Sequence, residues 1–203
     1  MKKIIGLTVA VVLVVVAVII LALRFFAAEP VSAQEAASEQ SARVLQEKID
    51  AIHAADAKKS RQGSETLEVS EVELESYVIY KMRDVIPARV DSMDVQLTPG
   101  VVAADTKLTF PSDSTGNPLV DVIVAGTHTF YLKGKLAASD GRGRFELQEV
   151  KVDGIPVPLV LIETLVEKYV KPKYPEVDLK EPFPMPWGME GLTITTGKAT
   201  IIY

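Results

Sequence analysis

The sequence predicts an α+β fold in which a curved antiparallel sheet packs around one or two helices, preceded by a transmembrane helix and a helical stalk. Three observations predict this arrangement. An almost unbroken apolar run, Ile4 to Leu23, opens the chain. Three later stretches alternate apolar and polar residues with period two, as strands with one buried face do. Two segments with helical apolar spacing, 70–86 and 159–170, supply the cover that a half-apolar sheet needs.

The apolar run is long enough to be a membrane anchor. About 20 residues at 1.5 Å each span roughly 30 Å, which is the thickness of a bilayer's hydrocarbon core. The apolar region of a cleaved signal peptide is usually about 7 to 15 residues, closely followed by small residues. Here Arg24, Phe25 and Phe26 follow instead, and the tolerable cleavage pattern Val31-Ser32-Ala33 lies well beyond. We therefore favour an uncleaved anchor over residues 1–27.

The charges beside the anchor predict its orientation. Lys2 and Lys3 precede the span, which argues that the N-terminus stays in the cytoplasm. Arg24 on the far side weakens this asymmetry without reversing it. We expect a single-pass protein of the inner (plasma) membrane whose remaining residues form an extracytoplasmic, periplasmic domain.

Composition limits the classes of function. The chain has 203 residues, a formal net charge of -5 and no cysteine. After the anchor, roughly 170 residues leave room for one domain with a modest core plus a spacer. The acidic exported part argues against nucleic acid and against broad electrostatic binding to anionic lipid. Without cysteine there is no disulfide framework, thiolate nucleophile or cysteine metal site.

Residues 28–65 are predicted to form a spacer and an amphipathic stalk helix. The helix runs from Glu39 to about Ala57, and Val44, Leu45, Ile49 and Ile52 lie on one thin stripe of it. Such a stripe suits a membrane-proximal stalk, a weak coiled coil, or a helix docked on the domain. The polar residues 58–64 then indicate a hinge.

The folded domain is predicted over 66–203. Thr66 to Val69 is a short strand, and Ser70 with Glu73 forms the capping-box pattern that begins a helix. We expect this helix to end at Ile86-Pro87, because the residue before a proline resists the α conformation. Its apolar face comprises Leu74, Tyr77, Val78, Met82 and Val85.

Three hairpins build the predicted sheet. The first turns at Thr98-Pro99-Gly100, the second at Asp140 to Gly143, and the closing one at Thr196-Gly197. In the second hairpin the apolar phase shifts near Gln148 and Glu149, which predicts a bulge and hence a strongly curved sheet. The short apolar run 119–125 has no clear type.

The second helix is predicted from Leu159 to about Val170. Its apolar residues cover more than one narrow stripe, so we expect burial on more than one side. The segment is too short to span a bilayer.

Catalytic patterns are sparse, and we expect neither an enzyme nor a cofactor. His53 and His128 have no partner at metal-ligand spacing, so no metal site is predicted, and there is no Gly-x-Ser-x-Gly elbow. Glu71, Glu73 and Glu75 cluster on the first domain helix, and two suitably placed acids can hydrolyse glycosides. Near a helix N-terminus such acids also simply complement the dipole. A hydrolase that uses scattered carboxylates stays open as a third hypothesis.

The segment Phe183-Pro184-Met185-Pro186-Trp187 is expected to be extended, because proline occupies alternate positions. One interpretation is a strap packed over the core. The other is a groove lip or a membrane-touching edge, since tryptophan favours interfaces.

Four segments carry a resemblance to known families: Leu67 to Tyr77, Val95 to Val101, Gly154 to Pro158, and Pro186 to Ile194. In these, the chain resembles exported, membrane-anchored bacterial proteins of the YpmS-like and LmeA-like kind, related in fold to tubular lipid-binding (TULIP) domains. The resemblance covers about Thr66 to Tyr203 and implies a curved antiparallel sheet around a long helix, with lipid held in the concave face. It implies no catalytic residues, and the stalk belongs to no pattern of these families.

The leading functional hypothesis is lipid binding. If the curved sheet wraps loosely, its apolar residues line an elongated groove, where each buried methylene of an acyl chain contributes about 0.8 kcal/mol. The candidate ligand-binding residues are Leu74, Val78, Leu108, Phe110, Phe130, Leu132, Leu161, Leu165 and Trp187. The alternative is a filled core without ligand, in a structural or adaptor protein that binds an envelope protein partner through its stalk helix.

Overall fold

The computed structural model describes residues 37–58, 65–83, 86, 88–111, 125–167, 171 and 181–203. The predicted anchor, residues 59–64 of the predicted hinge and most of the run 119–125 lie outside these residues, as does the expected end of the second helix near Val170. None of the helices in the described part is long and apolar enough to cross a membrane.

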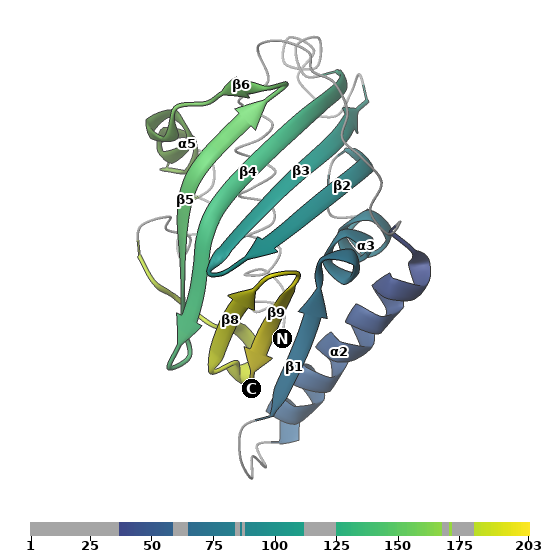
Figure 1. The fold of residues 1–203 in the computed structure, drawn as a ribbon, viewed down its shortest axis with the longest axis vertical. Coiled ribbons are helices and arrows are strands. Elements are labelled where there is room, and N and C mark those ends of the chain that lie inside the picture. Colours follow the sequence, from purple (N-terminus) through teal and green to yellow (C-terminus); the bar gives the residue numbers. More distant parts are fainter. Residues whose placement is uncertain are drawn as a thin grey trace.

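The described residues form an α+β fold dominated by one antiparallel sheet (Figure 1). Its main path has the order β1-β9-β8-β4-β3-β2, and β5 pairs with β4 and carries β6 and β7. The strands are β1 (Thr66–Ser70), β2 (Arg89–Thr98), β3 (Val101–Phe110), β4 (Gly126–Ser139), β5 (Arg142–Val152), β6 (Ile155–Pro156), β7 (Phe183–Pro184), β8 (Gly191–Thr195) and β9 (Lys198–Ile202).

All three predicted hairpins are confirmed, as β2–β3, β4–β5 and β8–β9. The β2–β3 turn is held between two other strands. The Gly100 N–H donates to the Ile194 carbonyl of β8 at 3.1 Å, and the Gly100 carbonyl accepts from the Leu136 N–H of β4 at 3.0 Å. These bonds tie β2 and β3 to the closing hairpin.

The predicted bulge is also confirmed. Lys133 pairs with Glu149, whereas the next residue, Gly134, pairs with Leu147, so Gln148 is the extra residue. Nearby, the Phe145 ring occupies the space above Gly134, where a built Cβ would lie 2.5 Å from its Cζ. An extra residue in one strand bends the pair and increases its twist.

One face of the sheet is apolar, because the cross-strand register aligns apolar residues in rows. Two buried clusters lie on this face. The first, here the Phe130 cluster, contains Ile86, Ala88, Leu108, Phe110, Phe130 and Val152. The second, the Ile194 cluster, contains Val95, Leu97, Ile194 and Ala199.

The helix α3 (Glu71–Lys81) begins as predicted. Ser70 is its N-cap, and the reciprocal bonds with Glu73 complete the capping box. The predicted end at Ile86 was wrong, because the helix stops at Lys81 with Met82 as its C-cap. Beyond the C-cap, the Ile86 N–H donates to the Met82 carbonyl at 3.1 Å.

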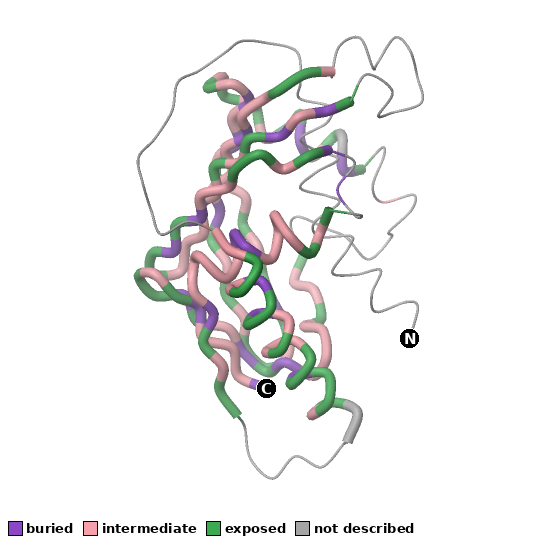
Figure 2. Tube along the Cα trace, turned by 90° about the vertical axis from the view of Figure 1, so that its right-hand side faces the viewer, coloured by how far each residue is buried: buried purple, intermediate pink, exposed green. Residues whose placement is uncertain are grey.

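The helix α2 (Glu39–Lys58) packs along α3 (Figures 1 and 2). Its residues Ala42, Leu45 and Ile52 are buried, while Val44 remains 38% exposed. The Ser38 N–H donates to the buried Ser76 hydroxyl of α3 at 3.0 Å. Of the three arrangements open for this helix, the structure therefore has the docked one.

The helix α5 (Leu159–Leu165) lies beside β5 at the edge of the sheet (Figure 1). Ile162 and Val166 are buried, but Val160 is 68% exposed and Leu161 is 43% exposed. The prediction of burial on more than one side was therefore wrong for the described part. The reason is position: a helix beside an outer strand meets the sheet along one side.

Candidate ligand-binding site

A cavity of about 740 Å³ lies beside the C-terminal end of α3. Volumes of about 300 to 1,000 Å³ are typical of small-molecule sites. Ile86, Ala88 and Val90 belong both to the cavity wall and to the packing of the Phe130 cluster. The lining residues are Ile79, Arg83, Ile86, Ala88, Arg89, Val90, Thr109 and Pro111.

Two guanidinium groups accompany these aliphatic walls. The Arg83 Nε donates to the Ile79 carbonyl at 3.0 Å, and the Arg83 guanidinium lies over the Tyr80 ring at 5.1 Å. The Arg89 Nε donates to the Asp91 carboxylate at 2.6 Å. Of the two cations, Arg89 thus has a carboxylate partner, whereas Arg83 has none among the described residues.

The carboxylate of Asp91 is held in its charged form. Partial burial alone would raise the pKa of Asp91, but the hydrogen bonds from Thr109 and Arg89 outweigh burial and lower it. The Thr109 hydroxyl also lies 2.7 Å from the Thr127 hydroxyl of β4. Asp91 and the two threonines therefore fix the strand that carries Arg89.

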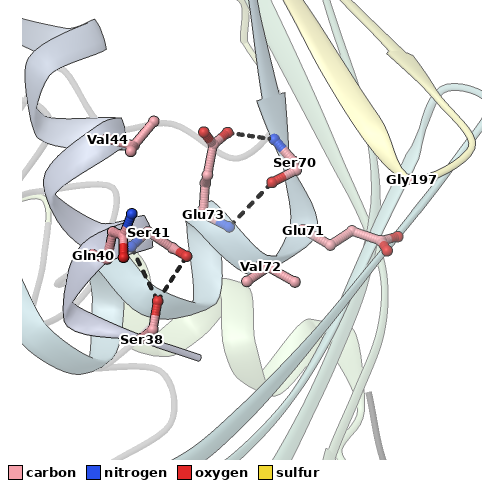
Figure 3. Close-up of a pocket in the computed structure, with 9 residues that line it drawn as sticks. All are labelled: Ser38, Gln40, Ser41, Val44, Ser70, Glu71, Val72, Glu73 and Gly197. Atoms are coloured by element: carbon pink, nitrogen blue, oxygen red, sulfur yellow. Dashed lines mark hydrogen bonds between the residues drawn. The ribbon is translucent and has the colours of Figure 1, made fainter. Parts of the chain in front are cut away.

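A second cavity, of about 540 Å³, lies between the N-terminal ends of α2 and α3 (Figure 3). Its walls are mostly polar, and their groups bind one another. The Ser38 hydroxyl lies 2.8 Å from the Ser41 hydroxyl, and the Glu73 carboxylate accepts from the Ser70 N–H at 2.8 Å. Such a lining does not suit an acyl chain, so the cavity at the end of α3 is the better candidate.

The three clustered glutamates each have a structural partner. The Glu71 carboxylate accepts from the Leu97 N–H at 2.6 Å, and the Glu75 carboxylate accepts from the Val95 N–H at 2.8 Å. Glu73 caps α3 and binds the Lys48 ammonium at 2.6 Å. The three glutamates therefore hold α3 against β2 and α2, and these contacts explain why acidic residues cluster there.

Burial raises the pKa of Glu75, and the neighbouring charges of Asp94 and Glu71 raise it further. The hydrogen bond from the Val95 N–H opposes this rise in pKa.

His128 and Asp153 form a pair that the sequence did not indicate. The His128 Nδ1 lies 2.8 Å from the Asp153 carboxylate, whose other oxygen accepts from the Thr129 N–H at 2.8 Å. The His128 Nε2 is buried and has no hydrogen-bond partner among the described residues. The two residues meet because the β4–β5 register brings the end of β5 beside the start of β4. No group of three potential metal ligands occurs in the part of the chain that the structure describes.

The predicted ligand-binding residues do not form one surface. Val78, Leu108, Phe110 and Phe130 come together in the Phe130 cluster, but the last three are only 1–2% exposed. They form a filled core that adjoins the cavity and do not line it.

The other predicted residues are dispersed. Leu74 packs on the Ile194 cluster, Leu132 is half-buried, and Leu161 is exposed. The side chain of Leu165 lies outside the described part. Trp187 packs with Ile52, Met189 and Tyr203, and its ring centroid lies 4.1 Å from that of His53.

The cavity residues Ile79, Arg83 and Arg89 were missed because they lie near a helix end and at the start of a strand. Sequence periodicity is weakest at such boundaries. The available signal was the pair of cations, Arg83 and Arg89, on either side of the apolar run Val85 to Ala88.

A scan of protein-family models finds no match to the chain, and a search of curated proteins finds none with significant similarity.

Proposed function

We propose that this is a membrane-anchored envelope protein whose exported domain binds lipid or another amphiphile. The observation that carries the proposal is the cavity at the end of α3, which combines aliphatic walls with Arg83 and Arg89. Aliphatic walls favour an acyl chain, and a guanidinium favours a phosphate or carboxylate head. The ligand is therefore an amphiphile with an anionic head.

The curvature of the sheet supports the same proposal. The bulge at Gln148 bends the β4–β5 pair, and the Phe130 and Ile194 clusters lie on one face of the sheet. A concave apolar face around a helix is also what the resemblance to tubular lipid-binding domains implies. The apolar run 4–23 would keep this domain at the source of its ligand.

Photo-crosslinking tests the proposal. The full chain is reconstituted in vesicles that contain a diazirine-bearing fatty acid, irradiated, and mapped by peptide mass spectrometry. We expect crosslinks in the peptides that contain Ile79, Ile86 and Val90. The replacement Ile79→Trp fills the cavity and should reduce these crosslinks several-fold. The control Val44→Trp places the same ring on α2, in the wall of the second cavity, and should leave them unchanged.

Two outcomes would reject the proposal: no crosslinks in these peptides, or crosslinks that Ile79→Trp does not reduce. The charge requirement has its own test, because Arg83→Gln should lower crosslinking of the ionised fatty acid more than that of its methyl ester.

The filled Phe130 cluster favours a second candidate, a non-catalytic adaptor of an envelope complex. Phe130 is 1% exposed, so its ring is packed in the core of the described part of the chain. A partner would then bind the exposed side of α2, which includes Val44. Crosslinking in native membranes separates the two candidates, since a stoichiometric protein partner without lipid adducts indicates the adaptor.

A further inference from the structure

Several features converge on one end of the sheet, which we call the α5 end. Here β2 and β4 begin, at Arg89 and Gly126, and β3 and β5 end, at Phe110 and Val152. The opposite end carries the turn between β4 and β5 at Asp140. In Figure 1, β6 and α5 lie at the top and this turn lies at the bottom.

The α5 end carries an exposed apolar surface. Val160 is 68% exposed and Leu161 is 43% exposed, which is unusual for large aliphatic side chains next to each other. Pro156 and Pro158, just before the helix, are exposed as well. From Gly154 to Ile162 the sequence has no charged residue. This surface has the composition of one that meets hydrocarbon.

The chain enters the described structure on the same half of the molecule. The Tyr80 hydroxyl donates to the Ala37 carbonyl at 3.5 Å, so Ala37 lies beside the C-terminal half of α3. Val78, in that half of α3, and Val157, just before α5, both pack against the Phe130 cluster. Residues 24–36 separate the apolar run 4–23 from this point. Fully extended, such a segment reaches at most about 45 Å.

The candidate cavity is at the α5 end too, and its charge suits a membrane surface. Ile79, Arg83 and Arg89 line the cavity, and both arginines are exposed. Cations near a bilayer are attracted to anionic lipid head groups over about one Debye length. Arg89 is paired with Asp91, and Arg142 and Arg144 are exposed at the opposite end as well, so the cations support docking at the α5 end only together with its apolar surface.

We propose that the α5 end is a membrane-docking surface, with Val160 and Leu161 inserted into the outer surface of the bilayer that holds residues 4–23. The inference rests on the proposed function and deepens it, because it sets the mouth of the cavity against the membrane. An amphiphile would then pass between bilayer and cavity without crossing water. The partner is the lipid surface itself.

Site-specific fluorescence tests the docking. The chain has no cysteine, so Val160→Cys and Leu161→Cys give single labelling sites for the environment-sensitive fluorophore NBD. The labelled full chain is reconstituted in vesicles of phosphatidylcholine with anionic phosphatidylglycerol, with and without doxyl-labelled lipid. Ser139→Cys, exposed beside the turn at the opposite end of β4, is the matched control.

We expect NBD at residues 160 and 161 to emit at shorter wavelength than at residue 139, and to be quenched at least about twofold by the doxyl lipid. NBD at residue 139 should not be quenched. The docking is overturned if residues 160 and 139 are quenched equally, or if residue 160 is blue-shifted without quenching, because then protein covers the surface instead of lipid. Emission of Trp187, the sole tryptophan, verifies that each variant is folded.

The result is independent of the ligand experiment. Lipid quenching at residue 160 together with failed crosslinking around Ile79 would reject ligand binding and keep the docking. Crosslinking that Ile79→Trp abolishes, without quenching at residue 160, would reject the docking and keep ligand binding.

Discussion

The Glu75 carboxylate of α3 accepts a hydrogen bond of 2.8 Å from the backbone N–H of Val95 on β2, a terminal strand of the sheet path. The Glu71 carboxylate, one turn earlier, accepts a hydrogen bond from the Leu97 N–H. At the other terminal strand, β1, the Lys48 ammonium of α2 lies 2.5 Å from the Glu68 carbonyl. Charged side chains from helices thus occupy backbone groups that would otherwise be free to pair with another chain.

The first prediction concerns the pH dependence of stability. Burial raises the pKa of Glu75, so the folded state binds the proton more tightly than the unfolded chain does. Ionising Glu75 therefore costs stability, progressively as pH rises from its ordinary value of 4.5 through the raised pKa. Glu75→Gln keeps an acceptor oxygen without this cost. Relative to the variant, the wild type should lose stability as the pH rises above 4.5.

Urea unfolding of the detergent-solubilised full chain, followed by Trp187 fluorescence, measures this difference. Glu75→Ala is the control for the hydrogen bond, because it leaves the Val95 N–H unpaired and should cost about 1–3 kcal/mol. A stability difference between wild type and Glu75→Gln that does not change with pH would contradict the assignment.

The second prediction concerns the docking of α2. Lys48 binds the Glu73 carboxylate at 2.6 Å and also the Glu68 carbonyl, with both side chains partly buried. Lys48→Met should cost about 1–2 kcal/mol and speed amide hydrogen exchange across α2. Arg43→Met removes an exposed cation from the same helix, and it should change neither the free energy of unfolding nor the hydrogen exchange of α2. Equal exchange in both variants would show that apolar packing alone holds the helix.

The third prediction concerns the strap 183–187. A Cβ built on Gly143 would lie 2.6 Å from the Phe183 ring and 2.8 Å from the Met185 sulfur. Gly143→Ala should therefore cost about 1–3 kcal/mol through overpacking. In a Phe183→Ala background the same change should cost less, and a double-mutant cycle measures the coupling. Zero coupling would mean that the strap does not pack on β5 in solution.

The fourth prediction separates filled core from exposed surface among the predicted ligand-binding residues. Leu108 is 2% exposed, so Leu108→Ala should cost about 2–5 kcal/mol. Leu161 is 43% exposed, so Leu161→Ala should stay within about 0.5 kcal/mol. Thermal unfolding of the two variants measures the loss of stability that each replacement causes. Similar costs would mean that Leu161 is covered in the native protein.

Local patterns were sufficient where the structure depends on near neighbours. The capping box at Ser70, the three hairpin turns and the bulge at Gln148 are set by residues within a few positions of one another. Local patterns did not predict the helix end at Lys81 or the exposure of Leu161. Each of these depends on which surface of the sheet the segment meets.

The candidate site shows the same limit. The sequence predicted an apolar-lined domain, but of the residues named for its groove Leu108, Phe110 and Phe130 are packed in the core. Leu132, Leu161 and Trp187 lie elsewhere. The cavity instead combines Arg83 near the end of α3 with Arg89 at the start of β2 and Thr109 near the end of β3. No periodicity links three such positions, since their proximity is a property of chain packing.

The sequence by itself determined the alternation that makes one face of the sheet apolar, the turns that join its strands, and the caps that begin its helix. Those features depend on local backbone preference and on side-chain period. Only the tertiary structure decided that α2 docks on α3, that Glu71 and Glu75 bind the edge of β2, and that His128 meets Asp153. These contacts join residues 20 or more positions apart, and burial and register fix them where no local preference acts.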